Sequence, residues 1–484
     1  MDTIEFVDQT IRDAQQSLWA FLMRTDMIEP IAPLLDQVGY KAVATVGSHG
    51  YVVQARHLGE DPWERVRMLS RALPRTPLRG SYMTTSLASF EIDTPRDVIA
   101  LWIRRSVANG IRSFWICDYQ HHPERFHDLA QVVKAEGAEV VTTLVYTVSP
   151  IHDDAFFARQ TRKIVEVRDC VDAIMIEDPT GGLTPERTRR LLSVVSASCE
   201  GIPLEFHAHC ASGLAPLCYL EAIEQGVRTV HTAVAPLANG TSLPSTESIL
   251  RNVRRLGYRT SLDEEALATI SEHFRAVAER EGLPIGVPQD YDVFQQAHQV
   301  PGGMIANLRR QLGELGMESR LDEVLEEMIV VRRELGYPVM GTPYSQIVGV
   351  QAFENVVSGE RYGRVPNAVV KYVLGFYGEP EGPIDQDVLD RVLALPEAQA
   401  LAGVALDETL RTLAELREEH GPELSDDELL VRILVRGRRG GGPASQAKTS
   451  PAPARAPGLP AGLPLAFALE VDGEVFRVKV GQAS

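Results

Sequence analysis

Two patterns of apolar and polar residues alternate through the first half of the chain. Short apolar runs are each followed by a longer stretch in which apolar residues recur every three or four positions. The first pattern is typical of strands buried on both faces, and the second is typical of amphipathic helices. Strands are predicted at residues 4–8, 42–46, 78–83, 113–117, 139–146, 173–176, 204–207 and 229–234.

Eight strand–helix units in roughly the first 260 residues predict a (β/α)8 TIM barrel, because that α/β fold typically takes about 250 residues. A doubly wound open sheet is the alternative, because periodicity alone does not establish closure. In a parallel barrel the residues after each strand gather at one face. Polar residues occupy these positions, including Asp8, Asp13, Ser48, His49, Asp118, Glu177, His207, His209 and Asn239.

The pattern changes after the barrel of residues 1–260. Residues 261–436 show helical periodicity without intervening strands, which predicts a mostly helical second domain, with helices at 263–281, 305–315, 321–335, 366–374, 386–395 and 407–417. Residues 437–464 are rich in Gly, Pro, Ala and Ser, as expected of a flexible linker. In residues 465–484 apolar positions alternate on both sides of Asp472-Gly473, which predicts a terminal β-hairpin with a type I′ turn.

Composition and charge limit the partners and the cellular locations that we expect for the protein. The formal net charge of −18 argues against nucleic acid as a partner and against an anionic membrane surface. Five cysteines without a Cys-x-x-Cys pair favour a reducing, cytoplasmic location over a disulfide framework. The chain opens on an acidic segment rather than a signal peptide, and no apolar run approaches the ~20 residues of a membrane span. No membrane insertion is expected.

His207 and His209 lie at the end of the seventh predicted strand and just beyond it. Residues i and i+2 of a strand face the same side, so both imidazoles can reach one point beyond the strand's end. Histidine is the commonest metal ligand, and one interpretation is a divalent metal site. The other is two polar residues where a strand meets solvent.

Seven segments resemble those of a known protein family and occur in the same order and register over roughly residues 3–390. The segments are DQTIRDAQQS at 8–17, HAH at 207–209, APLANGTSLPSTES at 235–248, VPGGM at 300–304, TPYSQIVG at 342–349, GERY at 359–362 and LGFYG at 374–378. They resemble the carboxyltransferase domains of biotin-dependent enzymes, namely pyruvate carboxylase, the oxaloacetate decarboxylase α subunit and the transcarboxylase 5S subunit. More distantly, the metal-binding segments are similar to those of the lyase and synthase barrels related to hydroxymethylglutaryl-CoA lyase and isopropylmalate synthase.

The resemblance implies roles for individual residues. It assigns Asp13, His207 and His209 to a divalent metal, with zinc, manganese or cobalt as candidates. It implies that Thr241 shuttles a proton between biotin and the acceptor carbon, and that Arg12 and Gln16 hold the acceptor's carboxylate and carbonyl. The resemblance also implies that Asp118 and Thr241 bind the biotin.

The chain also departs from the family pattern. Glu177 stands where the family has a carbamylated lysine as fourth metal ligand, and we expect its carboxylate to take that role. Cys210 replaces an aspartate, and Met83 aligns with an arginine that grips a 2-oxo acid; Arg79 could replace that arginine only if the strand's register shifts. The segment Val46-Gly47-Ser48-His49-Gly50 replaces a Trp-Gly-Gly-Ala-Thr motif. His49, His121 and His122 are either replacement contacts or ordinary surface residues.

The implied function is that of a biotin-dependent carboxyltransferase subunit. It would move CO2 between carboxybiotin on a separate carrier protein and an enolisable acceptor, either a 2-oxo acid or an acyl thioester. The chain contains no Ala-Met-Lys-Met segment, so a biotin carboxyl carrier protein, docked through the terminal hairpin, and a biotin carboxylase subunit are the expected partners. A homo-oligomer is also expected from the resemblance. The alternatives are a metal-dependent lyase or aldol-type enzyme on the same barrel, or a non-catalytic scaffold subunit.

Overall fold

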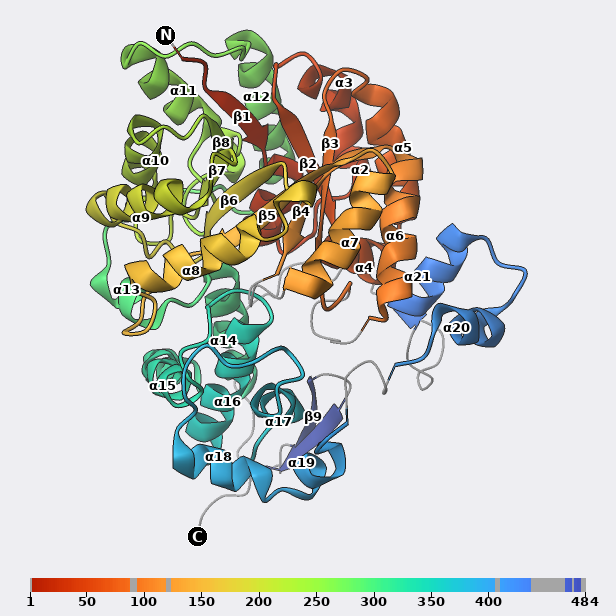
Figure 1. The fold of residues 1–484 in the computed structure, drawn as a ribbon, viewed down its shortest axis with the longest axis vertical. Helices are drawn as coiled ribbons and strands as arrows, with labels where there is room; N and C mark the ends of the chain where they lie inside the picture. Colours follow the sequence, from red (N-terminus) through yellow and green to blue (C-terminus); the bar gives the residue numbers. More distant parts are fainter. Residues whose placement is uncertain are drawn as a thin grey trace, which may run out of the picture. The chain divides into compact units, whose positions relative to one another are not determined.

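The computed structural model describes residues 2–87, 94–118, 123–404, 410–436, 466–471 and 474–479. Eight parallel strands close into a barrel in chain order, with the first strand paired to the eighth (Figure 1). The strands are β1 (Glu5–Asp8), β2 (Ala42–Gly47), β3 (Leu78–Met83), β4 (Ile111–Cys117), β5 (Glu139–Val145), β6 (Ala173–Asp178), β7 (Leu204–Ala208) and β8 (Thr229–Thr232). The TIM-barrel prediction is confirmed, and the open sheet is not formed.

Helices cover the outside of the barrel because each presents one apolar face to the strands. In α9, the Thr184 hydroxyl accepts the N–H of Arg187, Pro185 occupies the first turn, and Leu191 and Val195 are buried. The helices that follow the barrel strands are α1 (Gln15–Trp19), α2 (Thr25–Ile28), α3 (Ala32–Leu35), α4 (Ser48–Val53), α5 (Pro62–Ala72), α6 (Arg96–Asn109), α7 (Pro123–Ala135), α8 (Asp154–Val165), α9 (Pro185–Ser198), α10 (Ala215–Glu224) and α11 (Thr246–Arg255), with short turns η1 (Thr10–Ala14), η2 (Glu29–Ile31), η3 (Gln54–Leu58), η4 (Arg168–Cys170) and η5 (Ala235–Leu237).

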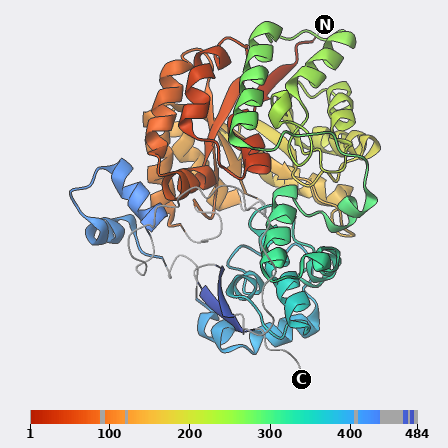
Figure 2. The ribbon, with the colours of Figure 1, turned by 180° about the vertical axis from the view of Figure 1, so that it is seen from behind.

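The next helix, α12 (Glu264–Glu281), also belongs to the barrel's apolar core. The Asp263 carboxylate caps its first turn, and Leu267, Ile270 and Phe274 are buried in one cluster with the strand residues. Figure 2 shows this helix, in green, beside the red N-terminal helices. The apolar core of the barrel therefore includes residues beyond 260. The division of the chain into domains at 260, 436 and 464 stays a prediction.

A second apolar core follows, built from helices, from the loops between them and from Val145 at the end of β5. Its elements are α13 (Val293–His298), α14 (Gly302–Glu314), η6 (Glu318–Arg320), α15 (Leu321–Glu334), α16 (Tyr344–Ser358), α17 (Asn367–Val373), α18 (Gln386–Leu393) and α19 (Pro396–Leu401). This helical region packs on the residues that follow the barrel strands. Gln295 donates to Thr180 O at 3.1 Å, and Arg332 donates to Thr147 Oγ1 at 2.7 Å. Residues 1–435 form one compact unit.

The last two helices return to the barrel. Of the helix predicted at 407–417, residues 407–409 lie outside the described residues and residues 410–412 are not helical. Instead α20 (Leu413–His420) begins after Thr412, whose hydroxyl forms a capping box with Glu415. Within α20 and α21 (Asp426–Arg436), Leu416, Leu430 and Leu434 join the barrel core. Trp63 of α5 donates its indole N–H to Asp427 O at 3.2 Å. In Figure 1 α21 lies beside α6, and α20 lies next to α21.

The end of the chain forms a second compact unit, residues 436–484. In it β9 (Ala466–Val471) and β10 (Glu474–Lys479) pair antiparallel, with Val471 opposite Glu474. This pairing agrees with the predicted hairpin, whereas the turn at 472–473 and the linker at 437–464 lie outside the described residues. In the part of the chain that the structure describes, the helices are too short or too polar to cross a bilayer.

Candidate active site

The turn after β1 brings two charged residues to the mouth of the barrel. Asp8 ends the strand and accepts hydrogen bonds from the Thr10 N–H at 3.2 Å and the Thr10 hydroxyl at 2.5 Å. The chain then forms the π-helical turn η1, which carries Arg12 and Asp13. Such turns are rare and occur frequently at functional sites.

Asp13, His207 and His209 meet at this mouth, as the sequence predicted. Each offers one ligand atom, all three atoms lie within 4.8 Å of one another, and all three residues are buried. The His209 Nε2 atom is 3.3 Å from Asp13 Oδ1 and 3.3 Å from His207 Nε2. Two imidazole nitrogens and one carboxylate oxygen form a donor set that suits zinc, manganese or cobalt.

Charge in this group is set by burial and by the close approach of its members. Burial alone would raise the pKa of Asp13, but His209 and Arg12 hold it below its ordinary value. Burial lowers the pKa of His207 well below its ordinary value. Burial also opposes charge on His209, yet the Asp13 carboxylate raises the pKa of that imidazole. Asp13 thus stays ionised and His207 neutral, which are the forms that bind a metal.

Glu177 lies near the three candidate ligands but outside their group. It is buried near the end of β6, and its Oε2 atom makes no hydrogen bond. Burial raises its pKa to about 8, against the attraction of Arg12 and with added repulsion from Asp13. A buried carboxylate oxygen without a partner is unusual in a folded protein. It therefore fits the expected role of a fourth ligand to an ion at this site.

Arg12 is held in place by two neighbours. Its guanidinium forms an ion pair with Asp13 and lies over the Trp115 ring, 4.2 Å from the ring centre. Gln16, half-buried on α1, follows Arg12 by four positions, about one helical turn. Both predicted acceptor-holding residues thus lie on the segment that carries Asp13.

Thr241 is joined to the candidate metal ligands through its backbone. His209 Nδ1 donates to Thr241 O at 2.7 Å, and the Thr241 hydroxyl donates to Ser17 O at 2.9 Å. Asn239 and Gly240, just before it, have left-handed backbone conformations with φ of 67° and 60°, and these turn the loop back toward the mouth. The predicted proton shuttle is therefore beside the candidate metal site.

The remaining residues that the sequence suggested for the site are not among the candidate metal ligands or lie outside the described residues. Asp118 is buried after β4 and contributes, after burial, to raising the pKa of Tyr344 in the helical region. Arg79 does not take the place of the family's acceptor-gripping arginine, because its buried guanidinium binds Glu205 and Glu139 inside the barrel. His121 and His122 lie outside the described residues, as does the side chain of His49.

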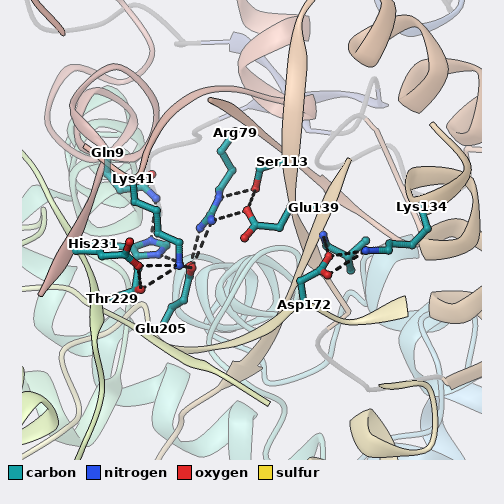
Figure 3. A network of polar contacts seen from close by, with 12 residues as sticks. Gln9, Lys41, Arg79, Ser113, Lys134, Glu139, Asp172, Glu205, Thr229 and His231 are labelled. Carbon is teal, nitrogen blue, oxygen red and sulfur yellow. Dashed lines mark hydrogen bonds and ion pairs between the residues drawn. The ribbon is translucent and has the colours of Figure 1, made fainter. Parts of the chain in front are cut away.

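A polar network inside the barrel was not predicted (Figure 3). It runs from His231 on β8 to Glu205 on β7, at 2.9 Å, and from Glu205 to Arg79 on β3, at 2.6 Å. Lys41, the residue before β2, lies with its Nζ 3.2 Å from Glu205 Oε1. The signal that could have revealed it is the presence of charged residues in runs predicted as buried strands, since such residues need partners.

Two family models match the chain. The model described as "HMGL-like" matches residues 3–273, and the "Conserved carboxylase domain" matches residues 296–436. A pyruvate carboxylase subunit of Methanocaldococcus jannaschii is 37% identical over 99% of this chain and 84% of the relative. The chain belongs to the carboxyltransferase family of biotin-dependent carboxylases. It is a biotin-dependent carboxyltransferase subunit.

Further similarities of this carboxyltransferase agree with that assignment. The "2-oxoglutarate carboxylase large subunit" of Hydrogenobacter thermophilus is 30% identical over 99% of the chain and 75% of the relative. The "Methylmalonyl-CoA carboxyltransferase 5S subunit" of Propionibacterium freudenreichii is 30% identical over 82% of this chain and 77% of the relative. The carboxyl transferase domain of Rhizobium etli pyruvate carboxylase has the same fold, with a TM-score of 0.81, 24% identity, and coverage of 90% of this chain and 76% of that one.

Proposed function

We propose that this carboxyltransferase transfers a carboxyl group between N1-carboxybiotin and a 2-oxo acid, with a divalent metal bound by Asp13, His207 and His209. The observation that carries the proposal is the convergence of these three side chains, with His209 bonded to the backbone of Thr241. The relatives named as a pyruvate carboxylase subunit and as a 2-oxoglutarate carboxylase large subunit support a 2-oxo acid as the acceptor.

Glu177 completes the ligand set in this proposal. Support comes from its buried oxygen without a partner and from the charges of Asp13 and His209 that act on it. A bound divalent ion would polarise the acceptor's carbonyl oxygen and so favour loss of a proton from the neighbouring carbon. A glutamate supplies a carboxylate at this position without carbamylation.

Arg12 and Gln16 bind the acceptor. The guanidinium offers paired N–H donors to a carboxylate, and its stacking on Trp115 fixes its plane. Met83, on β3, provides no second cation, so Arg12 holds the acceptor's carboxylate without help from that strand. Gln16 donates its amide to the acceptor's carbonyl oxygen. The acceptor therefore sits between α1 and the candidate metal ligands.

Thr241 moves the proton. In the carboxylation direction the bond between biotin N1 and the carboxyl carbon breaks, and a carbon–carbon bond to the acceptor forms. The Thr241 oxygen accepts the proton lost from that acceptor carbon, and its own proton passes to biotin N1, so the hydroxyl is restored. The hydroxyl now donates to Ser17 O, which leaves its lone pairs ready to accept. Asp118 contacts the biotin ring from the end of β4.

The biotin reaches the site on a carrier domain outside these 484 residues, and a biotin carboxylase subunit recharges it. The conserved carboxylase domain match and the names of the relatives support membership in such a complex. The same domain match favours carboxyl transfer over a biotin-independent lyase on this barrel.

The test measures decarboxylation of carboxylated biotin carrier with pyruvate, 2-oxoglutarate and acyl-CoA thioesters as alternative acceptors. We expect turnover with a 2-oxo acid, stoichiometric metal in the wild type, and loss of that metal in His207→Ala. Thr241→Ala should lose transfer by roughly 100-fold or more while keeping its metal, and Thr241→Ser should retain more activity. A metal-free but active wild type, or full activity in Thr241→Ala, would contradict the proposal.

A further inference from the structure

His231 lies between the two chain segments that supply the candidate metal ligands. It is completely buried on β8, and its Nδ1 atom is 3.2 Å from His207 Nδ1. The same Nδ1 is 2.9 Å from Gln9 Nε2, which lies at the start of the turn carrying Asp13. Figure 3 shows Gln9 and His231 at one end of the polar network. One imidazole thus contacts both sources of ligands.

The hydrogen positions follow from the chemistry of a metal ligand. His207 Nε2 faces His209 Nε2 at 3.3 Å, so it is the atom that faces the site. A neutral imidazole that binds metal through Nε2 carries its hydrogen on Nδ1 and must donate that hydrogen to an acceptor. For His207 the acceptor is His231 Nδ1, which the Gln9 amide Nε2 also faces as a second donor, so both contacts require this Nδ1 to carry no hydrogen. His231 consequently carries its own hydrogen on Nε2, 2.9 Å from Glu205 Oε2.

Glu205 is fixed as an acceptor by cations. Arg79 donates to its two oxygens at 2.6 and 3.3 Å, and Lys41 approaches at 3.2 Å. Because Glu205 is bonded to both cations, its carboxylate accepts the Nε2 hydrogen of His231, which leaves His231 Nδ1 free of hydrogen.

His209 has a different acceptor for the same purpose. Its Nδ1 donates to a backbone oxygen, Thr241 O, whereas His207 depends on a side chain. We infer that His231 is a positioning residue, which accepts the Nδ1 hydrogen of His207 and so directs the Nε2 lone pair of His207 at the metal. This inference rests on the proposed metal site and extends it to a residue that does not itself bind the metal.

Two amide replacements of His231 separate this role from simple packing. The amide oxygen of asparagine reaches the position of histidine Nδ1, while the amide of glutamine reaches that of Nε2. His231→Asn therefore keeps an acceptor for His207 but loses the contact with Glu205. His231→Gln keeps a donor for Glu205 but leaves the His207 Nδ1 hydrogen without its acceptor.

The experiment titrates the metal-free full chain with Co2+ and follows cobalt absorption. We expect His231→Gln to weaken Co2+ binding by about 10- to 100-fold, the usual effect of losing a hydrogen-bond partner of a metal ligand. His231→Asn should stay within about threefold of the wild type. His273→Gln is the control, because His273 bonds only to Met27 O among the polar contacts of the described residues, and it should bind like the wild type.

The outcomes are distinguishable. A wild type that binds no Co2+ would overturn the proposed metal site and this inference with it. A wild type that binds, with His231→Gln unchanged or with His231→Asn equally weak, would overturn the positioning role alone. Circular dichroism of the metal-free variants checks that each is folded. If His231→Gln does not fold, tight binding by His231→Asn is still required.

Discussion

Gly302 of α14 lies directly against Thr241 of the barrel. A Cβ atom at position 302 would meet Thr241 Cγ2 at 1.8 Å and Thr241 Cβ at 2.5 Å, far inside ordinary van der Waals contact. The backbone of the helical region therefore forms one wall of the site around the threonine. Because Gly302 has no side chain, the methyl group of Thr241 can lie against α14, and any larger residue at position 302 would displace the whole Thr241 side chain.

Gly302→Ala should displace Thr241 and slow carboxyl transfer. A displacement of about 1 Å in a catalytic group can cost about 100-fold in rate, so we expect a fall of roughly 10- to 100-fold in kcat with the metal retained. Gly313→Ala in the same helix is the matched control, since a Cβ there meets no atom within 4 Å. It should keep full activity and raise stability by about 0.5–1 kcal/mol. Equal activity in the two variants would contradict this view of Gly302.

Glu177→Gln tests the fourth ligand. An amide is a much weaker metal donor than a carboxylate, so Co2+ affinity should fall by roughly 10-fold or more. Glu224→Gln, at an exposed position on α10, should leave affinity unchanged. The measurement is a cobalt titration of the metal-free protein. If Glu177→Gln binds Co2+ as tightly as the wild type does, Glu177 is not a ligand.

Asp8 should make stability depend on pH. Burial raises its pKa to about 7 from 3.8, so in the folded protein it keeps its proton up to about pH 7, while the unfolded chain loses it near pH 4. Between these values the native state binds more protons, and the free energy of unfolding therefore falls as pH rises. Above about pH 7 the loss is complete.

Asp8→Asn cannot ionise and should lack this loss. The free energy of unfolding of the variant, relative to the wild type, should rise by roughly 2–4 kcal/mol between about pH 4 and about pH 8. Urea unfolding of the metal-free protein at about pH 4 and at about pH 8 measures this difference. Any effect of the substitution on the hydrogen bonds from Thr10 that is the same at both pH values cancels in the comparison. Asp128→Asn, an exposed position, is the control. A difference that does not change with pH would show that Asp8 has an ordinary pKa.

Deleting residues 465–484 should weaken binding of the biotin carrier. The β9–β10 pair is a two-stranded sheet, and isolated hairpins are marginally stable, so added strands from a partner would stabilise it. The barrel should keep its melting temperature, because residues 1–435 form their own compact unit. Pull-down with the carrier measures the effect, and undiminished capture by the truncated protein would refute the docking role.

The barrel could be predicted because its strands are covered on both faces. Burial on both faces produces continuous apolar runs that stand apart from the amphipathic helices around them, and all eight were found. The packing of α12 could not be predicted, since periodicity shows that a helix has an apolar face and not what that face contacts. The start of α20 was missed because its boundary depends on the cap at Thr412, three positions before Glu415.

In the site, the predictable part was local. Asp13 follows the first strand, and His207 and His209 differ by two positions at the end of the seventh, so strand periodicity within a parallel barrel predicts that all three lie at one face. The partners of His231 were not accessible in this way. Glu205 precedes it by 26 residues, and Arg79 precedes Glu205 by 126 residues. Closure of the barrel, rather than sequence spacing, places these three side chains together, and it also sends Arg79 away from the mouth.

The contact of α21 with the barrel also bears on synthesis. Trp63 is separated from Asp427 by 364 residues, so a ribosome releases one partner long before the other. Until then the outer surface of α5 lacks its cover. Nascent chains of this protein should therefore present an apolar patch on α5 that chaperones can hold until α20 and α21 have emerged.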